Sequence, residues 1–420
     1  MPDNHAVLVT GAVGDIGSRV VANLTARGVP VRALVHHDDD RAQVLHAMAG
    51  VQVVVGDLTK APDVVAALDD CRRLYFGMSV SPLYLEAAAT VAVAGRDNGS
   101  VDLLVNISQM TVSQMDVKSA TESRQQRLHW LAEQVLDWSG LPVTHVRGTV
   151  FMENPLFRML AAASIQRNGT IRLPFGDART SPVAVRDVAD VVTRLLTDPP
   201  QPVGHVYQLT GAGSRDITAI AAEFSAALGR PITYVDVPYD EWLEHDLKPL
   251  GLPAHIQDHI ATMARLHKEN RYDRATSDIS DLLGRPPSGF DTLVRETPAL
   301  KVHLSHGGAY RPPLPFGFSL DVRGAVHRSR PRRRLVLRRH PAARYRNVSH
   351  NGISCCSACA AQVRAAGCLA PYPGATARVV VGRKRPGSAP ESVRRTVRRM
   401  ITFASISGEH GVMQGRVVRP

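Results

Sequence analysis

Cysteine, aromatic residues and long apolar runs are all scarce in this chain. Only Cys71 stands in the first 300 of its 420 residues, and Phe, Trp and Tyr make up 5% of the whole. No apolar stretch approaches the roughly 20 residues that a membrane-spanning helix needs. No basic segment precedes an apolar stretch at the start, as a secretory signal would require. These absences argue against a disulfide framework and a membrane protein, and we expect a cytoplasmic protein.

Acidic residues are nearly absent from one part of the chain. The net charge is +12, but residues 301–420 hold 23 of the 50 Lys and Arg and only three of the 38 Asp and Glu. That segment therefore carries +20, whereas residues 1–300 carry −8. Nucleic acid is consequently a candidate partner only for the last 120 residues, where positive charge could bind it without sequence specificity.

The segment 301–420 also lacks hydrophobic periodicity, so we expect it to be a disordered basic tail. Three origins stay open: a flexible arm that contacts nucleic acid or anionic lipid, a folded module, and a product of a shifted reading frame. Arginine greatly outnumbers lysine throughout, as GC-rich coding DNA would produce.

Four cysteines of this tail stand close together, as Cys355, Cys356, Cys359 and Cys368. Zinc sites usually show two pairs of ligands at short spacing, and Cys368 has no neighbour of this kind. We therefore predict no metal.

An apolar run near the start of the chain breaks into three glycines spaced three apart. Residues 6–9 predict a buried strand and residues 18–24 a helix, with Gly11, Gly14 and Gly17 between them. Gly11 permits a tight turn, Gly14 lets the backbone approach a pyrophosphate, and Gly17 lets helix and strand pack closely. The start of the helix would offer free N–H groups to phosphates. An ordinary glycine-rich turn is the alternative.

Strand and helix signals alternate over the first 150 residues. Further strands are expected at 31–35, 51–55, 73–78, 103–108 and 142–147, with helices at 41–49, 62–68, 83–95 and 129–136. This alternation predicts an α/β protein with a Rossmann-type, doubly wound parallel sheet. The strand ends at Gly11, His36, Asp57, Gly77 and Ser108 would line one carboxyl edge, where such folds bind ligands.

Seven short motifs follow one another along residues 5–300. They are Thr10-Gly11-x-x-Gly14-x-x-Gly17, Gly56-Asp57-Leu58, residues 139–144, Arg147 with 151–154, residues 185–190, residues 207–211, and residues 283–288 with Phe290. Their ordered set resembles the NmrA-like group of atypical short-chain dehydrogenase/reductases, which includes quinone and azo-dye reductases and redox-sensing regulators. The resemblance implies a dinucleotide-binding domain at 1–150 and a smaller lobe at 151–300 that covers the nicotinamide end.

The resemblance also implies which residues contact the dinucleotide. They are Thr10, Gly11, Val13, Gly14, Asp15, Ile16, Gly17, His36, Asp57, Leu58, Gly77, Phe151 and Asn154. In NADP-binding relatives a basic residue at the position of His36 binds the 2′-phosphate. An acidic residue there accepts hydrogen bonds from the ribose hydroxyls instead. Because His36 is not a carboxylate we expect NADP, with NAD as the alternative. Asp57 would close over the adenine or, alternatively, cap the next helix.

The usual proton donor of the superfamily, a Tyr with a Lys four residues later, is missing between Ser108 and Gly140. Alignment on Glu133 puts Gln125 at the Tyr position and His129 at the Lys position. We expect His129 and Ser108 near the reacting atoms. The alternatives are that His129 only pairs with Glu133 on one helix face and that Ser108 only ends a strand.

Two functions are consistent with the absence of the Tyr and Lys pair. One is hydride transfer to a small quinone-like or azo acceptor, because a hydroquinone anion is a far better product than a simple alkoxide and needs less help from a proton donor. The other is a regulator that binds NAD(P) without turnover and acts on a protein partner. We expect the oxidoreductase.

Overall fold

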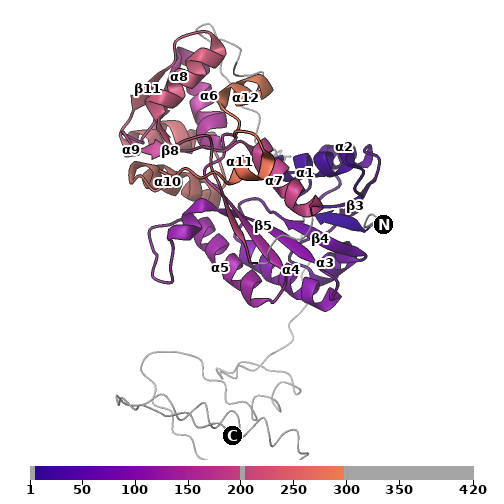
Figure 1. Cartoon of the computed structure of the whole chain (residues 1–420). Helices are drawn as coiled ribbons and strands as arrows, with labels where there is room; N and C mark the ends of the chain where they lie inside the picture. Colours follow the sequence, from indigo (N-terminus) through magenta and orange to yellow (C-terminus); the bar gives the residue numbers. More distant parts are fainter. Residues whose placement is uncertain (1–4, 199–203, 298–299, 301–420) are drawn as a thin grey trace, which may run out of the picture. The chain divides into compact units, whose positions relative to one another are not determined.

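The computed structural model of the protein describes residues 5–198, 204–297 and 300 (Figure 1). The predictions made for residues 301–420, including the four clustered cysteines, lie outside these ranges. No helix in the described ranges combines the length and apolar character that crossing a membrane requires. The chain divides into two units, 1–327 and 328–420, and the described residues all belong to the first.

Seven parallel strands form one sheet in the order β3-β2-β1-β4-β5-β6-β9. Their bounds are Ala6–Val9 (β1), Val31–Val35 (β2), Val51–Val55 (β3), Cys71–Phe76 (β4), Leu103–Gln109 (β5), Val143–Gly148 (β6) and Val206–Leu209 (β9). The predicted doubly wound sheet is confirmed. The strand order reverses at β1, between β2 and β4, and such a switch point opens a crevice at the carboxyl ends of the strands.

Helices cover both faces of the sheet. One face carries α1 (Asp15–Ala26), α2 (Asp40–His46), α7 (Val185–Thr197) and α11 (Asp278–Leu283), and the other carries α3 (Ala61–Leu68), α4 (Tyr84–Asn98) and α5 (Arg124–Trp138). Successive residues of β1 point to opposite faces, as a strand requires. Val7 and Val9 pack in the core that contains α1 and α7, whereas Leu8 packs in the core that contains α3 and α4.

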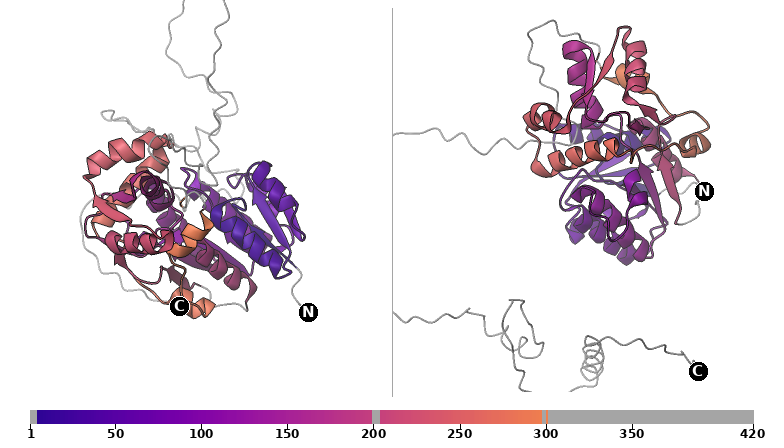
Figure 2. Two further views of the ribbon diagram at one scale, coloured as in Figure 1. Left: turned by 90° about the horizontal axis from the view of Figure 1, so that it is seen from above. Right: turned by 90° about the vertical axis from the view of Figure 1, so that its left-hand side faces the viewer.

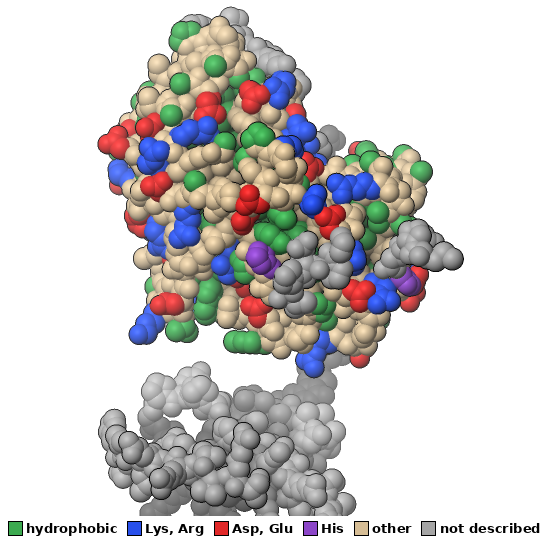
Figure 3. Space-filling model, in the orientation of Figure 1, with side chains coloured by type: hydrophobic (Ala, Val, Ile, Leu, Met, Phe, Trp, Pro, Cys, Tyr) green, Lys and Arg blue, Asp and Glu red, His purple; other side chains and the backbone are tan. Residues whose placement is uncertain are grey.

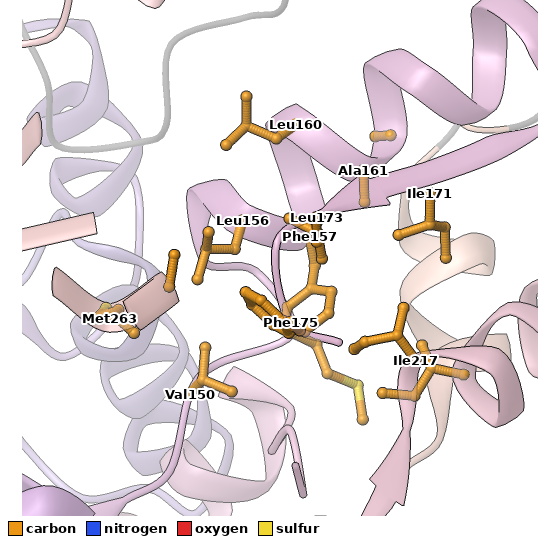
Figure 4. Packing of buried hydrophobic residues seen from close by; sticks show 14 of the residues in the cluster. Val150, Leu156, Phe157, Leu160, Ala161, Ile171, Leu173, Phe175, Ile217 and Met263 are labelled. Atoms are coloured by element: carbon orange, nitrogen blue, oxygen red, sulfur yellow. The ribbon is translucent and has the colours of Figure 1, made fainter. Parts of the chain in front are cut away.

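A second group of elements, here called the smaller lobe, has its own buried core. Its elements are η2 (Leu156–Ala161), α6 (Ala162–Asn168), β7 (Thr170–Leu173), α8 (Ile217–Leu228), β11 (Thr233–Asp236), α9 (Tyr239–Trp242), η3 (Leu243–Leu247), η4 (Lys248–Leu250), α10 (Ala254–Lys268) and α12 (Phe290–Glu296). Figure 4 shows Phe157 and Phe175 close to each other within this core, with Ile217 to one side. Helix α8 ends at Gly229, which adopts the left-handed conformation with φ +66°.

The chain passes between the sheet and the smaller lobe several times. Figure 2 shows the first hundred residues, in indigo and purple, gathered around the sheet. After β6 the chain enters the lobe, but α7, β9 and α11 return to the sheet before α12 packs in the lobe again. Short segments complete the described fold: η1 (Met110–Gln114) and the antiparallel pair β8 (Arg179–Thr180) and β10 (Arg215–Asp216). The chain thus first leaves the sheet at the end of β6, after Gly148.

Two motifs of the resemblance, 185–190 and 283–288, bind each other. The buried carboxylate of Asp187, in the first turn of α7, accepts hydrogen bonds from Ser288 N at 2.6 Å and Ser288 Oγ at 2.9 Å. Arg285 pairs with the same carboxylate at 2.8 Å and with Asp190 at 2.5 Å. These motifs therefore fasten the segment between α11 and α12 onto α7.

Candidate functional site

A cavity of about 770 Å³ opens at the carboxyl edge of the sheet. Its walls come from the turn between β1 and α1, from the ends of β2 to β6, and from α10 of the smaller lobe. The structure brings together here Gly11, Val13, Gly14, Asp15, Ile16, Gly17, His36, Asp57, Leu58, Gly77, Phe151 and Asn154 among the predicted cofactor residues, and both Ser108 and His129. A cavity of this size is typical of sites for cofactors and drug-sized ligands.

The glycine turn leaves no room for side chains. Gly11 has φ +56°, and a Cβ there would lie 2.6 Å from the oxygen of Gly77. A Cβ on Gly17 would lie 2.3 Å from the oxygen of Gly11. Helix α1 begins after Gly14, and no side chain caps it. The open turn and uncapped helix start form a cradle that suits a diphosphate.

Thr10 is the one predicted cofactor residue that does not line the cavity. Its buried Oγ1 accepts a hydrogen bond from Gly77 N and donates one to Gly77 O, both at 2.9 Å. Thr10 thereby ties the end of β1 to the end of β4 beneath the glycine turn.

Asp57 forms a turn with Thr59 at the end of β3. Its Oδ1 accepts hydrogen bonds from Thr59 N at 2.9 Å and Thr59 Oγ1 at 2.8 Å, and these bonds lower the pKa of the Asp57 carboxyl. Helix α3 begins only at Ala61, with Lys60 as its N-cap residue. The alternative that Asp57 caps this helix is therefore wrong. Asp57 lies three residues before the N-cap residue, and its carboxylate accepts hydrogen bonds from Thr59 instead.

Basic side chains stand where β2 ends. His36 is exposed, lines the cavity, and lies against His37 with ring centroids 4.1 Å apart. Arg41, in α2, also lines the cavity and was not predicted from the sequence. The side chain of Asp39 accepts a hydrogen bond from Arg41 Nε at 2.9 Å and so orients the guanidinium.

Two carboxyl groups lie in the wall near the glycine turn. Asp15 pairs with Arg158 at 3.4 Å, yet burial raises the pKa of Asp15 above its ordinary value. Glu153 accepts a hydrogen bond from Val185 N at 3.0 Å, and burial raises its pKa to about 7. Sequence reasoning missed Glu153, because burial in a cavity wall cannot be read from a motif.

His129 lies in the cavity wall as a neutral ring. Burial is the main reason that its pKa falls to about 3, and nearby His259 adds to the shift. Its ring centroid is 4.1 Å from that of Tyr84, and its buried Nδ1 has no hydrogen-bond partner within the described ranges. A neutral imidazole cannot supply the positive charge that a lysine provides at the aligned position.

The alternative pairing of His129 with Glu133 is wrong. Both oxygens of the buried Glu133 carboxylate accept hydrogen bonds from Arg147 of the adjacent β6, at 3.0 and 2.5 Å. Gln125, the residue aligned with the usual Tyr, accepts a hydrogen bond from Ser81 N at 3.1 Å and does not line the cavity.

Ser108, Phe151 and Asn154 lie near the end of the cavity formed by β5 and β6. Ser108 Oγ is buried and has no hydrogen-bond partner in the described part of the chain. The ring of Phe151 covers Gly148, where a Cβ would come within 2.8 Å of it. Asn154 Oδ1 accepts a hydrogen bond from Leu156 N at 3.0 Å.

The smaller lobe contributes a largely apolar wall that sequence reasoning did not find. Ile256, His259, Ile260 and Met263 come from α10, and Tyr272 follows that helix. The spacing 256, 260, 263 predicts one face of a helix. The resemblance implies that the lobe covers the nicotinamide end, but nothing in the sequence indicates which helix face does so.

Charges of both signs are mixed on one face of the described part of the chain. On the face in Figure 3, Lys and Arg are interspersed with Asp and Glu. The described ranges also contain no group of three or more His, Cys, Asp or Glu side chains placed to hold a metal ion.

The sequence matches the model of the NmrA-like family over residues 3–291. The chain belongs to the NmrA-like family. An NAD(P)H azoreductase from Xenophilus azovorans is 28% identical to this NmrA-like protein over 289 residues, which are 68% of this chain and 95% of the azoreductase.

Solved structures share the fold. An NADPH-dependent quinone oxidoreductase from Escherichia coli, complexed with NADPH, superimposes with a TM-score of 0.59 at 22% identity over 69% of this chain and 99% of that one. The negative transcriptional regulator NmrA, in complex with NADP, gives a TM-score of 0.58 at 20% identity over 70% of this chain and 96% of that one. The NmrA-like fold thus occurs in both a reductase and a regulator.

Proposed function

We propose that this NmrA-like protein binds NADPH and catalyses hydride transfer to a quinone-like or azo acceptor. The observation that carries the proposal is that one cavity contains both the glycine turn and the apolar wall of α10. A dinucleotide held by the turn would share that space with a flat apolar acceptor.

The residues present fit a dinucleotide. The cradle at Gly11, Gly14 and Gly17 excludes side chains and offers the uncapped start of α1 to a diphosphate. His36 and Arg41 stand where β2 ends, which is the place for the adenine ribose in this fold and favours a 2′-phosphate. Ser108 and Phe151 would lie toward the nicotinamide.

When bound, NADPH supplies the hydride and its two electrons. The protein has to orient the acceptor, exclude water and stabilise the negative charge that the acceptor gains. Burial keeps His129 neutral, so this side chain does not act as a cationic acid at neutral pH. An acceptor whose reduced form is a stabilised anion, such as a quinone, suits that environment.

The names of the relatives support the same chemistry. The azoreductase aligns over nearly its full length, and the fold matches that of the quinone oxidoreductase from Escherichia coli, which was solved with NADPH.

A regulator that senses NAD(P) without turnover is the second candidate. The observation that favours it is that neither residue aligned with the usual pair retains its chemistry: Gln125 is tied to Ser81 and His129 is neutral. The likeness to NmrA, solved with NADP, supports this reading as well.

Calorimetry and an absorbance assay on the full chain separate the two candidates. We expect NADPH to bind more tightly than NADH, and the reduced-nicotinamide absorbance to fall when a panel of quinones and azo dyes is added. Binding of NADPH with no oxidation by any acceptor would favour the regulator. Absence of binding to either dinucleotide would contradict both.

A further inference from the structure

Two histidines in the cavity wall differ in how their rings are held. His129, on α5, has no partner for its buried Nδ1 in the described part of the chain. His259, on α10, has its Nδ1 2.7 Å from Oγ of Ser123, the residue that precedes α5. Both members of this second pair are buried, at 5% and 3% exposure. A contact between the sheet-bound part of the chain and the smaller lobe therefore fixes the His259 ring.

The hydrogen bonds of Ser123 favour one position for the proton of the His259 ring. Gln126 N donates to Ser123 Oγ at 3.2 Å as part of a capping box, so this oxygen already accepts one bond. Within the described ranges, the Ser123 hydroxyl has no other acceptor within hydrogen-bonding distance than Nδ1 of His259. In the arrangement that uses this hydroxyl hydrogen, Ser123 donates to Nδ1, and a neutral ring then carries its proton on Nε2. Burial keeps the ring neutral, because it lowers the pKa of His259 to about 4.

The surroundings of His259 define what its Nε2–H would meet. Its neighbours in the cavity wall on α10 are Ile256, Ile260 and Met263, all apolar, and the neutral ring of His129 lies nearby. A donor in such a setting gains most from an oxygen that becomes negative, because a low local dielectric strengthens the interaction. A neutral imidazole N–H can polarise a carbonyl in this way without giving up its proton.

We propose that Nε2–H of His259 donates a hydrogen bond to a carbonyl oxygen of a quinone acceptor, and that Ser123 positions the ring. This inference rests on the proposed function and narrows it to carbonyl acceptors. As the C4–H bond of the dihydronicotinamide breaks, the hydride would form an O–H bond at the quinone's other carbonyl oxygen, so the quinone is reduced by two electrons and the nicotinamide is oxidised. The negative charge falls on the oxygen that faces His259, and water then supplies the proton that completes the hydroquinone.

The first test needs no turnover. The full chain, labelled with ¹⁵N in its 17 histidines, is compared with His259→Gln so that the missing signals identify His259. We expect a neutral ring protonated on Nε2 in the wild type at neutral pH, and a mixture of both neutral forms in Ser123→Ala. A ring protonated on Nδ1, or a positively charged ring, would overturn the proposal.

The second test measures oxidation of NADPH by a naphthoquinone. We expect kcat to fall about 10²-fold in His259→Leu, since loss of one such donor has effects of this size. His259→Gln, which keeps a neutral N–H donor, should recover part of that loss. Ser123→Ala should lower kcat with an unchanged KM for NADPH. Asp216→Ala is the matched control for loss of a cap. Asp216 is the N-cap residue of α8 and does not line the cavity, so this variant should leave kcat unchanged.

The outcomes separate the two levels of the proposal. A wild-type chain that binds NADPH but reduces neither quinones nor azo dyes would end both this inference and the proposed reductase function. A chain that reduces azo dyes but no quinone would end this inference alone. Wild-type turnover that persists unchanged in His259→Leu would end the assignment of His259 alone.

Discussion

The pKa of the buried His267 side chain tests whether water reaches the packed core behind the cavity wall. This side chain of α10 has 0% exposure and lies between Phe175 and Tyr272, with ring centroids 4.2 and 3.9 Å from its own. Its Nδ1 donates to Met263 O at 2.7 Å, and its buried Nε2 has no partner within the described ranges. Burial lowers the pKa of His267 from 6.5 to about 3.

A depressed histidine pKa makes stability depend on pH in one direction. The stabilising contribution is complete above the ordinary pKa near 6.5 and is lost as the pH falls toward the folded value, because the unfolded chain binds the proton more readily. For one such ring the loss is about 2 kcal/mol at about pH 5. His129 and His259 are shifted in the same direction, so the protein as a whole should be sensitive to mild acid.

The variant His267→Phe keeps the aromatic stack but cannot be protonated. Urea unfolding followed by tryptophan fluorescence, at neutral pH and at about pH 5, gives the free energy of unfolding in each condition. We expect the wild type to lose about 2 kcal/mol more than the variant between the two conditions. His255→Gln changes an exposed histidine of the same helix and is the control. An equal loss in wild type and His267→Phe would refute a neutral, water-free ring.

Three further predictions concern other parts of the site. Because burial raises the pKa of Glu153 to about 7, its contribution to stability is complete below its ordinary value of 4.5 and is lost as the pH rises through 7. Glu153→Gln should therefore be more stable than wild type by about 3 kcal/mol at about pH 8. Thermal unfolding of both proteins at about pH 4 and about pH 8 measures this gain, which would be absent if the carboxyl were solvated. Arg147→Leu leaves the carboxylate of Glu133 buried without its partner and should lower the free energy of unfolding by about 3–5 kcal/mol in urea; a loss below about 1 kcal/mol would contradict a buried charge. Gly17→Ala forces the turn open and should weaken NADPH binding about tenfold or more in calorimetry, whereas Gly213→Ala, in open space, should leave it unchanged.

Those parts of the fold that depend on local pattern could be predicted from the sequence. The apolar runs and the glycines between them indicated the strands and the first turn. The rule that parallel strands end at one edge then placed Gly11, His36, Asp57, Gly77 and Ser108 together, and all five line the cavity.

Contacts between distant segments could not be predicted in this way. The spacing of His129 and Glu133 suggested a pair on one helix, but the carboxylate binds Arg147 of a neighbouring strand, which offers two donors in a matching geometry. Likewise, the face of α10 that closes the cavity depends on how the smaller lobe packs, and helical periodicity shows only that a face exists.

The repeated passage of the chain between sheet and lobe limits how this architecture can be rearranged. The seventh strand, β9, and the helices α7 and α11 are encoded between stretches that build the lobe. No single continuous segment of the sequence encodes the lobe. Recombination that exchanges the lobe between two relatives would thus require several separate crossovers. Point substitutions along α10, which lines the cavity, need no such crossover.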